Sequence, residues 1–296
     1  MTDGKINTGT SAALGTFDGL HLGHMSVLKN ALCAEGLSPA VLLFDSSPKD
    51  VLSGSDTPKL MSDKKREEML CGMGFKIYKI SFREIMNFSP EEFFDEIIIG
   101  RLGAKKVCCG FNYTFGKGAR GNSETLNALC EKNGIECSVS GEVIHGGEIV
   151  SSTRIREYIS GGSIEKANGM LGRAFSFSGA VIHGDARGHT LGFPTANVPV
   201  DVTLAVPRFG AYESLVTLGD KKYKAVTNIG RRPTYPTENV LSETFITDFK
   251  QDIYGKEIEI SLLRFIREEK LFDSAESLIN QLKKDVDGVT ENVLGL

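Results

Sequence analysis

The stretch LGTFDGLHLGH, Leu14–His24, decides the first fold prediction. A short apolar run leads into a Gly-Thr-Phe-Asp-Gly turn, and a helical pattern begins directly after it. A strand, a glycine turn and a helix N-terminus together form an anion site, because unpaired backbone N–H groups and the helix dipole point at whatever lies above the turn. His21 and His24, three residues apart, lie on one helix face and can both donate to phosphate oxygens. The stretch therefore predicts a phosphate site.

Two alternatives stay open for this histidine pair. A zinc site needs a third ligand, and the remaining histidines stand at no ligand-like spacing from the pair: His145, His183 and His189. The pair could also be polar surface at the start of a helix. Regularly spaced glycines, which let a ligand approach the backbone, favour the phosphate site over that surface: Gly15, Gly19 and Gly23.

Length and composition limit the class of protein. The chain has 296 residues, 41% of them hydrophobic, which is enough for two globular cores. A net charge of -4 gives no general attraction to nucleic acid or to an anionic membrane. No apolar run approaches about 18 residues, and the first residues lack the order of a signal peptide, so a cytoplasmic protein is expected. The six cysteines form no CxxC pair and are expected to be reduced core thiols.

The two halves of the chain differ in periodicity. Residues 12–160 alternate short apolar runs with helical patterns, which predicts a parallel sheet covered by helices, with ligands at the carboxyl ends of its strands. After Gly172 the period changes to two, and a hairpin about Gly219-Asp220 is one of several short strands. That pattern predicts a closed or half-closed β-barrel.

The predicted domain boundary lies at Gly161-Gly162, which read as a helix stop. It divides the chain into 1–162, an α/β domain, and 163–296, an all-β domain. At the end of the chain a capping box and an apolar stripe over 273–286 predict a helix that closes the barrel.

A second anion site is predicted at SSTRIRE, residues 151–157. Three hydroxyls at a helix start precede two arginines, and guanidinium groups bind phosphate oxygens bidentately: Ser151, Ser152, Thr153, Arg154 and Arg156. This is the arrangement of a triphosphate site. The alternative, in which the hydroxyls are ordinary helix caps and the arginines a solvated face, stays open.

The second half contains no GxxxxGK[ST] motif, so a P-loop NTPase is excluded. Its phosphate-binding features are instead the glycines from Gly184 to Gly188 and the triplet Thr195-Ala-Asn197. In an extended strand Thr195 and Asn197 point the same way, so that a hydroxyl and an amide oxygen reach one Mg²⁺ bound with ATP. A β-turn closed by Asn197 is the alternative.

The motifs resemble two known families in succession. HLGH and SSTRIR resemble the HxGH and ISSTxxR signatures of the nucleotidylyltransferase superfamily, and GTFDGLHLGH and GFNYTFGKGARG (110–121) resemble its flavin branch. GHTLGFPTANV, NIGRRPTY and SETFITDFKQDIYGK resemble the riboflavin kinase module. The chain is thus similar to the bifunctional riboflavin kinase/FMN adenylyltransferase family. The resemblance implies a Rossmann-like nucleotidylyltransferase domain followed by a riboflavin-kinase-like barrel with a closing helix.

The resemblance also implies roles. Riboflavin, FMN and ATP are substrates, with FMN and FAD formed as products rather than held as prosthetic groups, and Mg²⁺ accompanies ATP. The catalytic residues for adenylyl transfer are His21, His24, Arg154 and Arg156, and Glu243 is the base of the kinase. The residues expected to contact ATP are Gly15, Thr16, Phe17, Asp18, Gly23, Asn112, Ser151, Ser152, Thr153, Gly184, Thr195 and Asn197. Whether Asp18 serves a metal or the flavin stays open.

Three positions depart from the family pattern. Ser47 stands where a Pro-His-Pro-like turn usually supplies a histidine, Phe245 replaces a histidine after Glu-Thr, and His189 replaces an arginine. Loss of the first contact motivates a second interpretation, a riboflavin kinase with a weak or altered adenylyltransferase domain. A third interpretation, from another class, is a flavin-binding regulator without turnover. Glu243 alone could also be an exposed strand glutamate.

Overall fold

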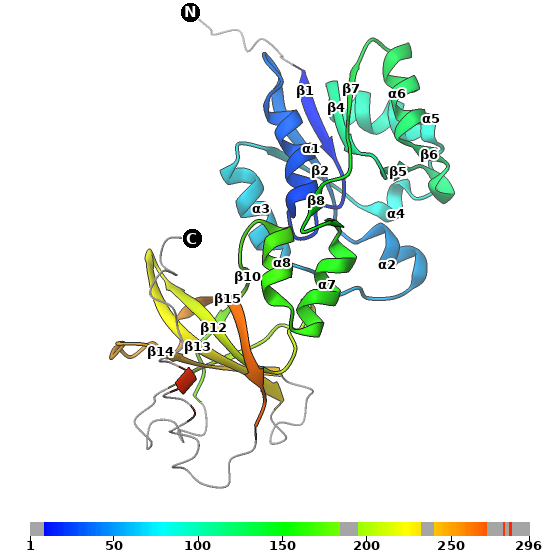
Figure 1. Cartoon of the computed structure of the whole chain (residues 1–296). Coiled ribbons are helices and arrows are strands. Elements are labelled where there is room, and N and C mark those ends of the chain that lie inside the picture. The colour runs from blue at the N-terminus through cyan, green and yellow to red at the C-terminus, as the bar shows by residue number, and fades with distance from the viewer. Residues whose placement is uncertain (1–8, 184–194, 232–239, 271–280, 282–283, 286–296) are drawn as a thin grey trace, which may run out of the picture. The chain divides into compact units, whose positions relative to one another are not determined.

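The computed structural model describes residues 9–183, 195–231, 240–270, 281 and 284–285. These residues fall into two compact units, one within 1–57 and 63–151 and the other within 58–62 and 152–296. The first unit is built on a parallel sheet and the second on an antiparallel one (Figure 1). The predicted combination of an α/β part and an all-β part is confirmed.

The first unit contains a five-stranded sheet in the order β3-β2-β1-β4-β7, and every pairing is parallel. Its strands are β1 (Thr10–Leu14), β2 (Ser38–Phe44), β3 (Lys76–Ile80), β4 (Ala104–Gly110) and β7 (Glu136–Ser140). The longer helices are α1 (Leu22–Leu32), α3 (Asp63–Gly72), a π-helix (Phe94–Arg101) and α6 (Ser123–Lys132). Shorter elements join them: α2 (Pro48–Ser53), α4 (Phe82–Ile85), α5 (Pro90–Phe93), β5 (Thr114–Phe115), a 3₁₀ turn (Lys117–Ala119), β6 (Gly121–Asn122), β8 (Ile144–His145) and β9 (Glu148–Ile149).

Alternate residues of the strands bury opposite faces of this sheet. On one face Leu14, Val107 and Cys109 join a core with side chains of α5, the π-helix and α6. Helix α1 packs against β1, β4 and β7. Parallel sheets need such cover, because their central strands are buried along their whole length, as the five residues of β1 are.

The strand order reverses at β1, and this places the first candidate site. The chain runs outward from β1 through β2 to β3 and then returns to the other side of β1 as β4. In open α/β sheets ligands bind at the carboxyl ends of the strands beside such a reversal. The turn after Leu14 lies at that end of β1, and the segment after Gly110 lies at the same end of β4.

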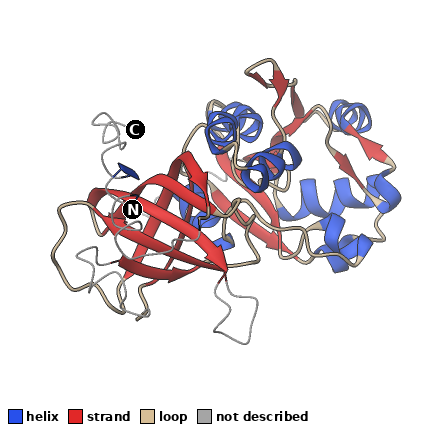
Figure 2. Cartoon of the chain, turned by 60° about the horizontal axis from the view of Figure 1, so that its bottom comes forward, coloured by secondary structure: helices blue, strands red, loops and turns tan. Residues whose placement is uncertain are grey.

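The second unit is a curled six-stranded sheet in the order β10-β15-β12-β13-β14-β11 (Figure 2). The strands are β10 (Phe175–Ala180), β11 (Thr195–Pro199), β12 (Gly210–Leu218), β13 (Lys221–Arg231), β14 (Val240–Ile246) and β15 (Glu257–Glu268). β12 and β13 form the predicted hairpin, with Leu218 opposite Lys221 and Gly219 at a φ of 59°. The two edges meet where the Ile182 N–H donates to the Asn197 carbonyl at 2.8 Å, so a half-closed barrel is confirmed.

The units divide after Ser151, eleven residues before the predicted boundary after Gly162. Helix α7 (Ser152–Gly161) packs against α8 (Ile164–Leu171) and groups with the second unit, because Gly161-Gly162 form the turn of a helical hairpin rather than a linker. A short segment from the first half, 58–62, also belongs to the second unit. There the Lys59 N–H donates to Thr203 O at 2.8 Å and Lys59 O accepts from the Ala205 N–H at 2.8 Å. Such a pairing of distant segments has no local sequence signal.

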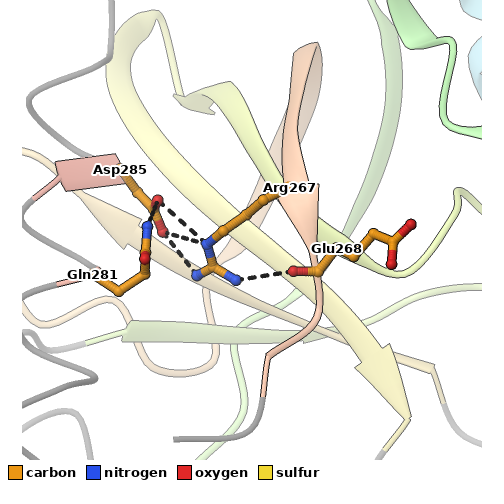
Figure 3. A network of polar contacts seen from close by, with 4 residues as sticks. All are labelled: Arg267, Glu268, Gln281 and Asp285. Carbon is orange, nitrogen blue, oxygen red and sulfur yellow. Dashed lines mark hydrogen bonds and ion pairs between the residues drawn. The ribbon is translucent and has the colours of Figure 1, made fainter.

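A buried ion pair ties the end of the chain to β15 (Figure 3). The Arg267 Nη2 donates to Asp285 Oδ2 at 2.8 Å, Nε lies 3.1 Å from the same oxygen, and the Asp285 side chain is 2% exposed. Gln281 also donates to Asp285, at 2.8 Å. Only three residues of the predicted closing helix are described, and all are helical: Gln281, Lys284 and Asp285. The rest of it lies outside the described residues.

The cysteines are all unbridged, but they do not all lie in the core. Cys108, Cys109 and Cys130 are buried, whereas Cys33 and Cys71 are exposed on helix surfaces, which corrects the expectation of core thiols for those two. Within the described part of the chain no helix is long and apolar enough to cross a membrane. No group of three or more His, Cys, Asp or Glu side chains is arranged to hold a metal ion among those same residues.

Candidate active sites

The turn after β1 has an unusual backbone. Phe17 and Leu20 have positive φ angles of 53° and 41°, and Gly19 between them has 81°. A residue other than glycine in this region costs about 1–3 kcal/mol, and such strain persists only where the surroundings hold it. Both side chains act as anchors, since Phe17 is 0% and Leu20 1% exposed. Gly15 leaves space for the Phe17 ring, which would lie 3.2 Å from a Cβ at that position.

The turn delivers both histidines to the first turn of α1. His21 is the N-cap residue, and its Nδ1 accepts from the His24 N–H at 3.3 Å. The two rings are stacked with centroids 3.6 Å apart, and the Phe17 ring meets His24 edge-on at 5.4 Å. A Cβ at Gly23 would lie 3.1 Å from the His21 ring, so glycine is what allows this ring to fold back over the helix start. The predicted pairing of the two imidazoles on one face is therefore present.

Asn112 lies at the carboxyl end of β4, next to β1. The Phe111 N–H donates to Ser140 O at 2.8 Å, which ties the segment after β4 to the end of β7. The side chain of Asn112 folds back over Gly110, where a Cβ would lie 3.3 Å from its Oδ1. Burial raises the pKa of the neighbouring Tyr113, which packs against the core below. Asn112 is exposed, as a residue that contacts a ligand must be.

The SSTRIR motif opens α7 as predicted. Ser151 directly precedes the helix, Ser152 and Thr153 begin it, and Ile155 points into the core. Arg154 and Arg156 are half-buried, and the Arg156 Nε donates to the Pro58 carbonyl at 2.6 Å. One donor of Arg156 is thus used to hold the inserted segment 58–62.

The second site is a row of polar residues across three strands. Register places Glu243 of β14 opposite Asn197 of β11 on one side and opposite Asn228 of β13 on the other. Residues directly opposite in an antiparallel pair point to the same face. The face opposite to theirs on β14 carries Ser242 and Thr244, which are 0% exposed. Glu243 therefore lies on the less buried face, between two carboxamides.

Thr195 and Asn197 lie in the extended strand β11, which overturns the alternative of a β-turn closed by Asn197. Asn197 is 5% exposed, and its Nδ2 lies 3.4 Å from Thr195 O. The Asn197 Oδ1 is buried and has no hydrogen-bond partner among the described residues. A buried oxygen without a donor is costly unless a ligand satisfies it, and a hard cation prefers such an oxygen.

Two neighbours of Glu243 were not found from the sequence. Asn228 is one, and only strand register could have revealed it. The other is Glu269, directly after β15: burial raises its pKa, and the nearby Glu243 carboxylate adds to the rise. Phe245, at a position where the family usually has histidine, lies opposite Thr195 on the same face as Glu243. Two other residues, Gly184 and His189, lie outside the described residues.

Two family models match the chain in succession. The model described as FAD synthetase matches residues 3–154, and the one described as riboflavin kinase matches residues 171–293. A relative named bifunctional riboflavin kinase/FMN adenylyltransferase, from Listeria monocytogenes, is 35% identical over 96% of this chain and 92% of its own length. The chain belongs to the bifunctional riboflavin kinase/FMN adenylyltransferase family.

Other members of the family match over similar lengths. The Bacillus subtilis protein is 35% identical and the Escherichia coli protein 30% identical, and they cover 92% and 94% of this chain. A solved structure, titled as a macrolide-efflux protein from Streptococcus pneumoniae, superposes with a TM-score of 0.87 at 32% identity over 95% of this chain and 94% of its own. The chain thus carries a FAD synthetase domain followed by a riboflavin kinase domain.

The departure at Ser47 has a local explanation. Ser47 is the N-cap of α2, where its Oγ accepts from the Asp50 N–H at 3.5 Å, and Pro48 follows at the first helical position. Serine and proline are both favoured at these positions of a helix start. In this member of the family Ser47 therefore caps the helix that follows β2.

Proposed function

We propose that this protein makes FAD in two ATP-dependent steps: phosphorylation of riboflavin to FMN, and adenylylation of FMN with release of pyrophosphate. The observation that carries the proposal is that each unit holds a set of residues suited to one step. The stacked imidazoles of His21 and His24 cap α1 in the first unit. The row of Asn197, Glu243 and Asn228 lies in the second.

In the adenylyl-transfer step a phosphate oxygen of FMN attacks the α-phosphorus of ATP. That phosphate is largely ionised at pH 7, so the protein has no need of a strong base and must instead align two anions and neutralise growing charge. The N-terminus of α1 and the imidazoles of His21 and His24 supply donors for this purpose. Asn112 and Ser151, in the same unit, are assigned to ATP. The family resemblance assigns Ser152, Thr153, Arg154 and Arg156 to the phosphates of ATP, and these residues of α7 group with the second unit.

Phosphorylation of riboflavin differs, because an alcohol must lose its proton. Glu243 is the proposed base, held by β14 between its two carboxamide neighbours. The unsatisfied Asn197 Oδ1 fits a Mg²⁺ ion, which Thr195 and Asn197 would hold together with the phosphates of ATP. When bound, the ion neutralises phosphate charge. Thr195 and Asn197 orient it, and Glu243 accepts the proton of the attacking hydroxyl.

One incubation tests the proposal against its alternatives. Purified protein is incubated with riboflavin, ATP and Mg²⁺, and the flavins are separated by chromatography. Formation of FMN and then FAD is the expected result. FMN alone would support a kinase whose adenylyltransferase domain is altered, and unchanged riboflavin would support a flavin-binding regulator. Supplying FMN directly checks the second step without the first.

A further inference from the structure

Arg66 is a largely buried arginine on α3, a helix rich in charged residues. Its side chain is 13% exposed, and Leu70 is the one residue that α3 buries fully. Taking a guanidinium out of water is unfavourable unless its hydrogen-bond partners are well placed. The hydrogen-bond partners of the Arg66 guanidinium therefore indicate its role.

The guanidinium joins α3 to the turn after β1. Its Nη2 donates to Asp63 Oδ1 at 2.9 Å, one turn earlier in the same helix, and its Nη1 donates to the Thr16 carbonyl at 3.2 Å, 50 residues away in the chain. Asp63 thus orients the planar group, and the other nitrogen reaches the backbone of the turn. Both contacts lie within the first unit.

Thr16 lies at the start of this turn. It precedes Phe17, whose φ of 53° begins the strained part of the turn, and the turn ends at His21. The buried side chains of Phe17 and Leu20 hold the turn on its apolar side. The hydrogen bond from Arg66 adds a restraint on the Thr16 carbonyl, at the start of the backbone that leads to His21 and its ring contact with His24.

We propose that Arg66 is a positioning residue for adenylyl transfer: its guanidinium holds the Thr16 carbonyl and so keeps the two imidazoles in their working places. This inference rests on the proposed function of the first unit. A purely stabilising role explains the contacts less well. The Arg66 Nε is buried and has no hydrogen-bond partner among the described residues, and a buried donor without a partner costs stability.

The experiment compares full-length variants in two separate assays, FAD formation from FMN and FMN formation from riboflavin. For Arg66→Gln we expect kcat of FAD formation to fall roughly 10- to 100-fold, because small misplacements of reacting groups have effects of this size. We expect KM for FMN, the kinase rate and the melting temperature to change little. Arg66→Lys, which can still donate to the carbonyl, should recover part of the loss. Lys64→Gln removes the same charge from an exposed position of α3 and should leave kcat unchanged.

Asp63→Asn keeps Arg66 but weakens its orientation, and it should give an intermediate loss of kcat. If Arg66→Gln does not fold, the kcat of Asp63→Asn serves as the test of the proposal instead. Equal losses of both activities together with the melting temperature would show that Arg66 is only structural, and unchanged FAD formation in Arg66→Gln would overturn the proposal outright. A wild-type protein that makes no FAD from FMN would instead refute the proposed function of the first unit.

Discussion

In the first unit the two histidines proposed for catalysis lie three residues apart along the chain, whereas in the second unit the proposed residues come from three strands. His21 and His24 depend on one turn, whose backbone conformation presents both imidazoles. Asn197, Asn228 and Glu243 meet only because β11, β14 and β13 pair in one register. A slip of one residue would turn Glu243 to the opposite face. The first site therefore depends on local backbone geometry, and the second on the integrity of a whole sheet.

The largest expected effect is that of Glu243→Gln, which removes the proposed proton acceptor and keeps nearly the same shape. Riboflavin phosphorylation should fall by roughly 10²- to 10⁴-fold, the usual contribution of a general base. FMN supplied directly should still be converted to FAD, since the change is confined to the second unit. Both rates are measured on the same preparation. A kinase rate equal to that of the wild type would return Glu243 to the role of an ordinary strand residue.

Arg267→Met tests how far the second unit depends on its sheet. The change leaves the carboxylate of Asp285, 2% exposed, without its cation, and an uncompensated buried charge costs about 3–5 kcal/mol. We expect a loss of this size in the free energy of unfolding of the second unit, measured by denaturant titration. The double variant Arg267→Met with Asp285→Leu removes both charges and should be more stable than the single variant. A single variant as stable as the wild type would show that the ion pair is unimportant.

His24→Ala tests the local site. Removing a donor aimed at growing negative charge slows such steps by roughly 10²- to 10³-fold, and we expect that loss in FAD formation. Kinase activity should persist, because the imidazole belongs to the first unit. Rates from FMN and from riboflavin are compared at saturating ATP. If both rates fell together in a folded protein, the assignment of one reaction to each unit would be wrong.

The smallest expected effect is that of Gly23→Ala. The added Cβ would lie 3.1 Å from the His21 ring, so the ring must shift by a few tenths of an ångström. FAD formation should decrease by roughly 10-fold or less, since displacements near 1 Å cost about 100-fold. Gly72→Ala, in α3, is the matched control, because a Cβ there meets nothing within 4 Å. A decrease of the same size in both variants would exclude the proposed crowding of His21.

Periodicity and turn chemistry predicted most of the first unit. The strand before the glycine turn, the helix after it and the helix at SSTRIR all depend on short-range patterns, and the structure has them. The grouping of α7 with the second unit was not predicted. Gly161-Gly162 end a helix whether the chain continues as a linker or as a hairpin, and only the packing of α7 on α8 distinguishes the two.

By itself the sequence determined the local features: the glycine turn with its two histidines, the helix at SSTRIR, and the motifs that identify the family. These are properties of neighbouring residues, for which backbone preferences and side-chain spacing are sufficient. Only the tertiary structure decided which distant residues join them. Asn228 reaches Glu243 through strand register, the segment 58–62 joins the second unit, and Arg66 reaches Thr16 from α3. Such contacts arise when whole elements pack to bury their apolar faces, and no short stretch of sequence records the partner.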